Sequence, residues 1–252
     1  MNSLDKTPKS NSQENPDREK KHIQTLMAMK VDGIIISISE NTVATDIFEL
    51  VTRRGMPIVF IDRVPKLENV NTVTVDDRGG AFKATELAIK MGYRKIGHFA
   101  GYSSINIGRQ RLLGFQDAMN KYGIEINPDW VIEGTFGESH GYNSLLKLYG
   151  QKNLPEFIFT ATYPIAFGIY RAAREINLKI PNELDLICFG NAKAHNFLSP
   201  PLSCIDQPTS LIGRDAMNIL LDNIENSDEY VPKRSIIETN IILRGTCIQK
   251  RN

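Results

Sequence analysis

Paired carboxylates and histidines are the residues of this chain whose types could carry acid–base or metal chemistry. Asp76 and Asp77 are adjacent and could share a proton, but they precede a predicted helix whose N-terminal dipole favours negative charge, so helix capping is the favoured interpretation. The four histidines are scattered along the sequence. His98 lies in the apolar run 96–99, where a packed core histidine is favoured over a ligand or a base.

Nucleotide-binding, hydrolase and zinc motifs are also missing from the sequence. It contains no GxGxxG after a strand, no GxxxxGKS/T, no GxSxG and no HExxH. The three cysteines are Cys188, Cys204 and Cys247, and they have no CxxC spacing. Buried free thiols in a reducing compartment are therefore favoured over disulfides or metal binding. We therefore predict a protein that is not an enzyme and that uses no metal and no cofactor.

The most informative segment runs from Ile176 to Pro208. It predicts a helix end, a proline turn, a buried strand over 184–189, an irregular polar loop and a second short strand that closes on Gln207-Pro208. A strand that opens into a polar loop is where open α/β sheets hold ligands. The last part of the segment is typical of a strand that crosses from one lobe to another, so the whole segment indicates a two-lobed ligand sensor.

The composition is that of an ordinary soluble protein. The chain has 252 residues, of which 41% are hydrophobic and 23% are charged, and its formal net charge of +1 gives no global field toward nucleic acid or an acidic membrane. No apolar run approaches the ~20 residues needed to span a bilayer. The first 22 residues contain no signal-peptide hydrophobic region. We predict a cytoplasmic protein with no membrane partner.

Short apolar strands alternate with amphipathic helices along the chain. The predicted strands are 34–36, 57–61, 72–75, 95–100, 131–135, 157–160, 184–189 and 235–243. The predicted helices are 42–54, 79–91, 105–122, 141–149, 164–176 and 211–224, after a first helix that begins at Pro16. This alternation predicts an α/β fold with parallel sheets covered on both faces. Two doubly wound lobes are favoured over a (β/α)₈ barrel, which would need eight regular units.

Breaks in the alternation predict how the chain divides. Residues 1–16 are polar and are predicted to form a disordered arm. The predicted N-terminal lobe comprises residues 17–101 and 208–228, and the C-terminal lobe comprises 102–207 and 229–252.

Several segments resemble the ligand-binding region of LacI/GalR-type transcriptional regulators. VDGIII at 31–36 and MPIVFID at 56–62 look like early strands of that region, and VDD at 75–77 with GYRKIGHFAG at 92–101 is similar to its next βαβ segment. RQRLLGF at 109–115 resembles the family's Arg-rich helix start, and the segment 176–208 resembles its final core. The order and spacing of these motifs make the resemblance specific over roughly residues 12–247.

The resemblance implies a periplasmic-binding-protein-like pair of lobes, of type I, that binds a small effector in the interlobe cleft. The family's effector is usually a sugar or a purine. Its binding changes lobe closure, and the change reaches an N-terminal DNA-binding domain through a homodimer interface. An effector can act in this way only when it prefers one of the two states.

The resemblance also assigns five residues to effector binding. Arg111 occupies an effector-contacting position, where its donor fork suits hydroxyls, a carboxylate or a purine edge, and a surface helix arginine is the alternative. Asp62 matches a cleft-lining position, with helix capping as the alternative. Phe159 matches an aromatic position that stacks on planar or sugar faces. Packing of this ring in the core is an equally favoured alternative. Thr162 falls at a polar pocket position, and Asn191 follows the strand 184–189.

Two positions depart from the family pattern. Gly190 and Tyr163 stand where the family commonly has aspartates, which accept hydrogen bonds from sugar hydroxyls or purine N–H groups. We therefore expect an unusual or anionic effector, or a role for Asn191 as the acceptor.

The family has a DNA-binding headpiece and a β-α-β segment before the position matched by residues 11–16. From this we expect an incomplete first lobe with an unpaired apolar edge beside 34–36, in a truncated product, a chain with a misassigned start or a partial chain. Operator DNA would be bound only through the missing N-terminal domain. The predicted function is the effector-sensing and dimerisation region of such a regulator; the alternative is a solute-binding protein of a transport system with the same fold.

Overall fold

The computed structural model describes residues 8–226 and 231–250. The chain forms two compact units, which are described separately. The first contains Met1–Val73 and Gly213–Ser235, and the second contains Thr74–Ile212 and Ile236–Asn252. No helix among the described residues is long and apolar enough to cross a membrane.

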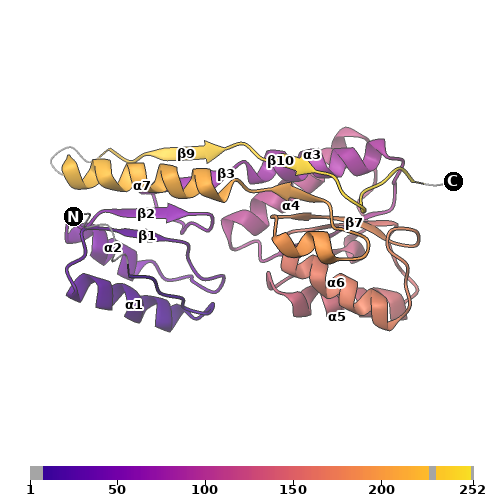
Figure 1. Cartoon of the computed structure of the whole chain (residues 1–252), viewed down its shortest axis with the longest axis horizontal. Helices are drawn as coiled ribbons and strands as arrows, with labels where there is room; N and C mark the ends of the chain where they lie inside the picture. Colours follow the sequence, from indigo (N-terminus) through magenta and orange to yellow (C-terminus); the bar gives the residue numbers. More distant parts are fainter. Residues whose placement is uncertain (1–7, 227–230, 251–252) are drawn as a thin grey trace. The chain divides into compact units, whose positions relative to one another are not determined.

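The first unit is built on a four-stranded sheet in the order β1-β2-β3-β9. Its strands are β1 (Ile34–Ile36), β2 (Ile58–Ile61), β3 (Asn71–Val75) and β9 (Arg234–Ile237). Its helices are α1 (Pro16–Ala28), α2 (Asp46–Arg53) and the greater part of α7 (Thr209–Glu225). Figure 1 shows α7 on one side of β1 and β2, with α1 and α2 on the other. The rings of Phe48 and Phe60 meet edge to face in the core, with their centroids 5.2 Å apart.

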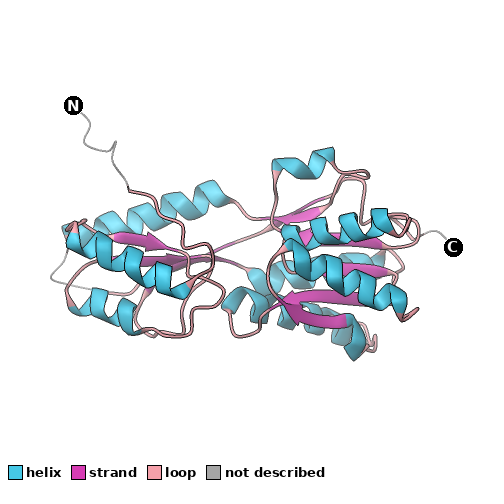
Figure 2. Ribbon diagram, turned by 90° about the horizontal axis from the view of Figure 1, so that it is seen from below, coloured by secondary structure: helices cyan, strands magenta, loops and turns pink. Residues whose placement is uncertain are grey.

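The second unit contains a six-stranded sheet in the order β10-β8-β7-β6-β4-β5. Its strands are β4 (Ile96–Gly101), β5 (Val131–Gly134), β6 (Phe157–Thr160), β7 (Asp185–Phe189), β8 (Cys204–Asp206) and β10 (Asn240–Ile242). Only β10 pairs antiparallel with its neighbour. The helices are α3 (Asp77–Lys90), α4 (Asn106–Lys121), α5 (Glu138–Gly150) and α6 (Tyr163–Glu175), with the short 3₁₀ helices η1 (Pro128–Trp130) and η2 (Lys193–Phe197). Figure 2 shows helices flanking these strands.

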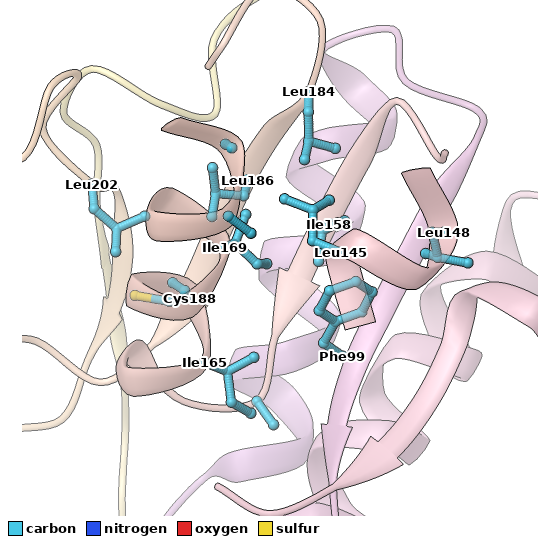
Figure 3. Packing of buried hydrophobic residues seen from close by; sticks show 14 of the residues in the cluster. Phe99, Leu145, Leu148, Ile158, Ile165, Ile169, Leu184, Leu186, Cys188 and Leu202 are labelled. Carbon is cyan, nitrogen blue, oxygen red and sulfur yellow. The ribbon is translucent and has the colours of Figure 1, made fainter. Parts of the chain in front are cut away.

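The core of the second unit lies where α5 and α6 cover the sheet. Side chains from the strands, including Phe99, Ile158 and Leu186, meet Leu145 of α5 and Ile169 of α6 (Figure 3). All five are completely buried. The central strands β4, β6 and β7 are buried at every position and are therefore mostly apolar rather than alternating, and this pattern predicted them from the sequence.

The predicted α/β class with doubly wound parallel sheets is confirmed. The position at which the chain first passes from one lobe to the other differs from the prediction. It was expected after Gly101, whereas the compact units separate between Val73 and Thr74. The reason is that β4 pairs with β5 and β6, which places residues 77–101 in the second unit. The two later boundaries fall after Ile212 and Ser235 rather than after residues 207 and 228.

The predicted final strand at 235–243 is two strands. β9 belongs to the four-stranded sheet and β10 to the six-stranded sheet. The backbone carbonyl of Ile237, the last residue of β9, also accepts a hydrogen bond from the amide of Asp76, 2.9 Å away.

Part of the predicted disordered arm makes specific contacts. Residues 1–7 lie outside the described residues, and residues 8–15 form no helix or strand. Glu14 accepts hydrogen bonds from both terminal nitrogens of Arg63, at 2.8 and 2.9 Å, and from the backbone amide of Glu40 at 2.8 Å. Asn15 then caps α1 by accepting a hydrogen bond from the amide of Arg18. The end of the arm, at Glu14 and Asn15, is therefore held against the first unit, which differs from the prediction for these two residues.

The strand β1 lies at the edge of the four-stranded sheet, where the family resemblance led us to expect it. Its neighbour is β2, with Ile34 opposite Ile58 and Ile36 opposite Phe60. Among the described residues no second strand pairs with it.

Candidate functional site

The carboxyl ends of three adjacent parallel strands in the second unit form the candidate site. β4, β6 and β7 end at Gly101, Thr160 and Phe189, and the register of the ladders brings these ends to one edge of the sheet. Helices α4 and α6 begin within a few residues of β4 and β6. This edge is where open α/β sheets bind ligands, because loops and helix N-termini converge there.

Arg111 lies beneath these strand ends and is only 1% exposed. Its Nε donates to Oδ1 of Asp77 at 2.8 Å, and its Nη1 donates to the carbonyl of Ala161, just past the end of β6, at 2.6 Å. Its guanidinium carbon lies 3.7 Å from the ring centroid of Phe189, the last residue of β7. Arg111 of α4 therefore connects α3 with the ends of two strands, and the alternative of a surface arginine is wrong.

The ion pair between Arg111 and Asp77 is buried on both sides. Nη2 of Arg111 lies 2.7 Å from Oδ1 of Asp77, and the two side chains are 2% and 4% exposed. Nη2 nevertheless has no aligned hydrogen bond with any described residue. The sequence pattern predicted that both Asp76 and Asp77 cap the following helix. Asp76 does cap α3 by accepting from the amide of Gly79 at 2.8 Å, whereas Asp77 pairs with Arg111.

Phe159 is fully buried and forms part of an aromatic stack. Its ring lies nearly parallel to that of His98 on the adjacent strand, with centroids 4.6 Å apart. The ring of Phe115 on α4 also stacks on His98, with centroids 5.3 Å apart. Nδ1 of His98 is 2.9 Å from the carbonyl of Phe159, and Nε2 has no partner among the described residues. Burial lowers the pKa of His98 to about 4. His98 is thus a core histidine, as the sequence favoured, and a ligand role for Phe159 stays a prediction.

Thr162 and Asn191 lie just beyond β6 and β7. Thr162 is half-buried at the N-cap position of α6, and its hydroxyl donates to the carbonyl of Phe136 at 2.8 Å. Asn191 is exposed, and its side-chain oxygen accepts from Nη2 of Arg244 at 3.0 Å. Arg244 also donates to the side chain of Asn196 and to the carbonyl of Leu202, which fixes the loop that follows β7. The sequence did not identify Arg244, whose partners are distant in the chain.

Gly190 has a backbone conformation that excludes most side chains. Its φ is +86°, and a Cβ atom there would lie 3.1 Å from Cδ1 of Tyr163 and 3.2 Å from the side-chain oxygen of Gln207. Tyr163 in turn contacts Phe167 and the buried ring of His195, at centroid distances of 5.4 and 5.6 Å. The two departures from the family pattern are therefore neighbours, and aromatic surface fills the space between them.

Asp62 is placed in the first unit, directly after β2. It is half-buried, has a φ of +56°, and its amide donates to the carbonyl of Val73 at 3.1 Å. The other predicted site residues, Arg111, Phe159, Thr162 and Asn191, belong to the second unit. Among the described residues no group of three or more histidine, cysteine, aspartate or glutamate side chains could hold a metal ion.

The fold and the strand-end site define a ligand-binding domain of the periplasmic-binding-protein type. The family described as periplasmic binding protein-like domain matches residues 85–247. The chain is 35% identical over 231 residues to the HTH-type transcriptional repressor PurR of Haemophilus influenzae (strain PittEE), and 34% identical over 231 residues to that of Pasteurella multocida (strain Pm70). Each alignment covers 90% of this chain and 67% of the relative, so the chain spans about two thirds of their length.

Solved structures with the same fold agree with these relatives. A putative ribose operon repressor from Burkholderia thailandensis superposes with a TM-score of 0.81 at 26% identity, covering 92% of this chain and 85% of that one. The transcription regulator CcpA of Lactococcus lactis gives 0.85 at 21% identity, over 94% and 86% of the two chains, and shows the fold alone. The chain belongs to the LacI-type transcriptional regulators and comprises their effector-binding region. This confirms the regulator prediction over the transport alternative.

Proposed function

We propose that this region binds a small, sugar-like effector at the carboxyl ends of β4, β6 and β7 and that binding controls a repressor. The observation that supports it best is the arrangement around Arg111, whose buried guanidinium contacts Asp77, the end of β6 and the ring of Phe189. Such a fixed donor group beneath strand ends suits ligand hydroxyls. A LacI family regulator from Enterococcus faecium, of 23% identity and TM-score 0.80 over 92% of this chain and 85% of that one, was solved with bound ribose.

Operator binding belongs, in this proposal, to a helix-turn-helix domain joined to this region in the working regulator. The curated relatives are named HTH-type repressors. No helix-turn-helix pattern was found in the sequence of this chain. We place the regulator in the cytoplasm with its operator. Free, buried cysteines agree with this location, and Cys188, Cys204 and Cys247 are all free and buried, as predicted.

The effector proposal is tested by thermal unfolding of the chain with ribose, cellobiose, hypoxanthine and ribose 5-phosphate. At least one of the neutral compounds should raise the unfolding midpoint in a saturable manner, because a ligand that binds only the native state stabilises it. Thr162→Val and Asn191→Ala should each reduce that shift. Thr52→Val is the matched control, because its hydroxyl also donates to a backbone carbonyl, that of Phe48, but in the first unit. Unchanged shifts in both site variants would show that the effector binds elsewhere.

We further propose that the region forms a homodimer through a surface on the second unit that includes Phe197. This ring is 87% exposed at the end of η2. A groove of about 770 Å³ beside it is lined by apolar side chains such as Leu178 and Ile180 and also by the basic residues Arg171, Arg174 and Lys179. One surface therefore carries both a protruding aromatic ring and a groove with apolar side chains. A two-fold axis can bring such a ring of each copy into the groove of the other.

Sedimentation velocity tests the homodimer. The wild-type chain should sediment as a dimer, and Phe197→Asp should shift it to monomer because a carboxylate would replace the aromatic contact. Tyr149→Asp is the matched control: Tyr149 is 44% exposed on α5 in the same unit, and its substitution should leave the dimer intact. A dimer that survives Phe197→Asp would exclude this surface.

A further inference from the structure

The charge of Arg111 is neutralised within the second unit. Asp77 is its ion-pair partner, and both side chains are nearly inaccessible to water. His98, which is close enough for the two groups to affect each other electrostatically, is uncharged at neutral pH because burial holds its pKa at about 4. The buried side chains beneath the strand ends therefore contribute no net charge in this part of the molecule.

A buried neutral pair discriminates between ligands by charge. In a medium of low dielectric constant, an anion placed against Arg111 would also lie close to the carboxylate of Asp77, and their repulsion would offset the attraction of the guanidinium. A neutral hydroxyl or carbonyl oxygen is not repelled by Asp77 in this way. It can accept hydrogen bonds from the N–H groups of Nη2, which have no aligned acceptor among the described residues.

We infer that Asp77 determines the specificity of this site, because it restricts the effector to one that presents an uncharged oxygen or ring nitrogen to Arg111. This inference rests on the proposed effector site and narrows its ligand class to neutral molecules. It also reverses the sequence-based expectation of an anionic effector. Asp77 is a positioning residue: it orients Arg111 through Nε and Nη2 rather than reaching the ligand.

The substitution Asp77→Asn tests the inference, because it keeps the size of the side chain and removes its charge. Arg111 then becomes a buried cation without a counter-ion, and a small anion should bind it. We expect about 100 mM inorganic phosphate, compared with sodium chloride of equal ionic strength, to raise the unfolding midpoint of this variant by roughly 5 °C more than that of the wild type. Isothermal titration should show a gain of at least about tenfold in phosphate affinity.

Asp117→Asn is the matched control. Asp117 pairs with Arg78 between the same two helices, α3 and α4, but that pair is solvent-exposed, with side chains 38% and 53% exposed. The change in charge is the same, yet phosphate should affect this variant no more than it affects the wild type. The double variant Asp77→Asn with Arg111→Gln removes both buried charges and should also lose the phosphate response.

Loss of a buried counter-charge can prevent folding, so the wild type supplies a second measurement. Saturable phosphate binding to the wild type that Arg111→Gln abolishes would overturn the inference, as would an Asp77→Asn variant that folds and ignores phosphate. Folding of Asp77→Asn in phosphate but not in chloride supports it, and so does a wild type that shows no phosphate binding. The phosphate measurements need no effector, so failure of every neutral compound to bind would contradict the proposed function alone.

Discussion

The ring of Tyr163 occupies the space that a side chain on Gly190 would need. A Cβ atom at position 190 would lie 3.1 Å from Cδ1 of Tyr163, and the φ of +86° adds backbone strain for any residue with a side chain. The end of β7 consequently presents backbone and an aromatic neighbour rather than a carboxylate. The two positions that depart from the family pattern are therefore close neighbours at the end of β7.

The first prediction concerns this contact. Gly190→Val should lower the free energy of unfolding by about 2–3 kcal/mol, since it combines strain at positive φ with a clash against Tyr163. Gly190→Asn should cost less, because asparagine tolerates positive φ better than a β-branched residue does. Urea unfolding measures both. Gly150→Ala is the control, since a Cβ atom there meets nothing within 4 Å, and it should change stability little. Equal effects at positions 190 and 150 would refute the packing argument.

The second prediction is a loss of stability in mild acid that arises from His98. Burial lowers its pKa to about 4 from an ordinary value of 6.5. The unfolded chain therefore binds a proton below pH 6.5 while the folded chain does not, so stability present above pH 6.5 is lost as the pH falls toward 4. Between pH 7 and pH 5 this amounts to about 2 kcal/mol.

Urea unfolding of the wild type and of His98→Gln at pH 7 and pH 5 checks this effect. The variant should be less stable at pH 7 but should lose about 2 kcal/mol less than the wild type on acidification. His195, which is fully buried and also has a pKa lowered to about 4, chiefly by burial, should contribute with the same sign. A dependence of stability on pH that His98→Gln leaves unchanged would mean that other groups dominate.

Patterns within one element were enough to locate most of the fold. The apolar runs 157–160 and 184–189 predicted the strands later observed as β6 and β7, because a strand covered on both faces has no polar face. The run 235–243 was misread as one strand, since alternation shows which residues face a core but not which of two sheets a residue joins. The first unit boundary was missed for a similar reason: only the pairing of β4 assigns it to the second sheet.

The candidate site was less predictable because its contacts join distant residues. Arg111 and Asp77 are separated by 34 positions, and nothing local to either indicates the pair. Arg244 meets Asn191 across 53 positions. The family resemblance located Arg111, whereas its burial, its partner and the neutral charge of the pair required the structure.

A third prediction concerns strong acid. Glu86 on α3 accepts hydrogen bonds from Lys90, Lys121 and the hydroxyl of Tyr122, and these contacts, led by Lys121, lower its pKa from 4.5 to about 2. Because the folded-state pKa is depressed, the stabilisation is present above about pH 4.5 and is lost as the pH falls toward 2. The lysines are more than half exposed, so solvent screening limits the contribution to about 1 kcal/mol. Urea unfolding of Glu86→Gln should show a shallower decline between pH 5 and pH 3 than the wild type, and an identical decline would exclude the effect.

The last prediction concerns Asp185, which holds the C-terminal segment against the second unit. Its completely buried carboxylate accepts hydrogen bonds from the amides of Cys247 and Ile248, at 2.7 and 2.9 Å, and from the hydroxyl of Tyr93 at 2.9 Å. Asp185→Ala should cost about 3 kcal/mol or more, because it leaves buried donors without an acceptor. Tyr93→Phe removes one donor and should cost about 1–2 kcal/mol.

Hydrogen exchange distinguishes this role from a general loss of stability. In Asp185→Ala the amides of Cys247 and Ile248 should exchange faster by a larger factor than amides of the core strand β6, because their acceptor is lost directly. Tyr122→Phe is the control for Tyr93→Phe: Tyr122 also donates to a carboxylate, that of Glu86, but it is 38% exposed. Its substitution should cost less than about 0.5 kcal/mol. Uniform acceleration of exchange across the second unit would show that Asp185 supports the whole sheet and does not specifically anchor the C-terminal segment.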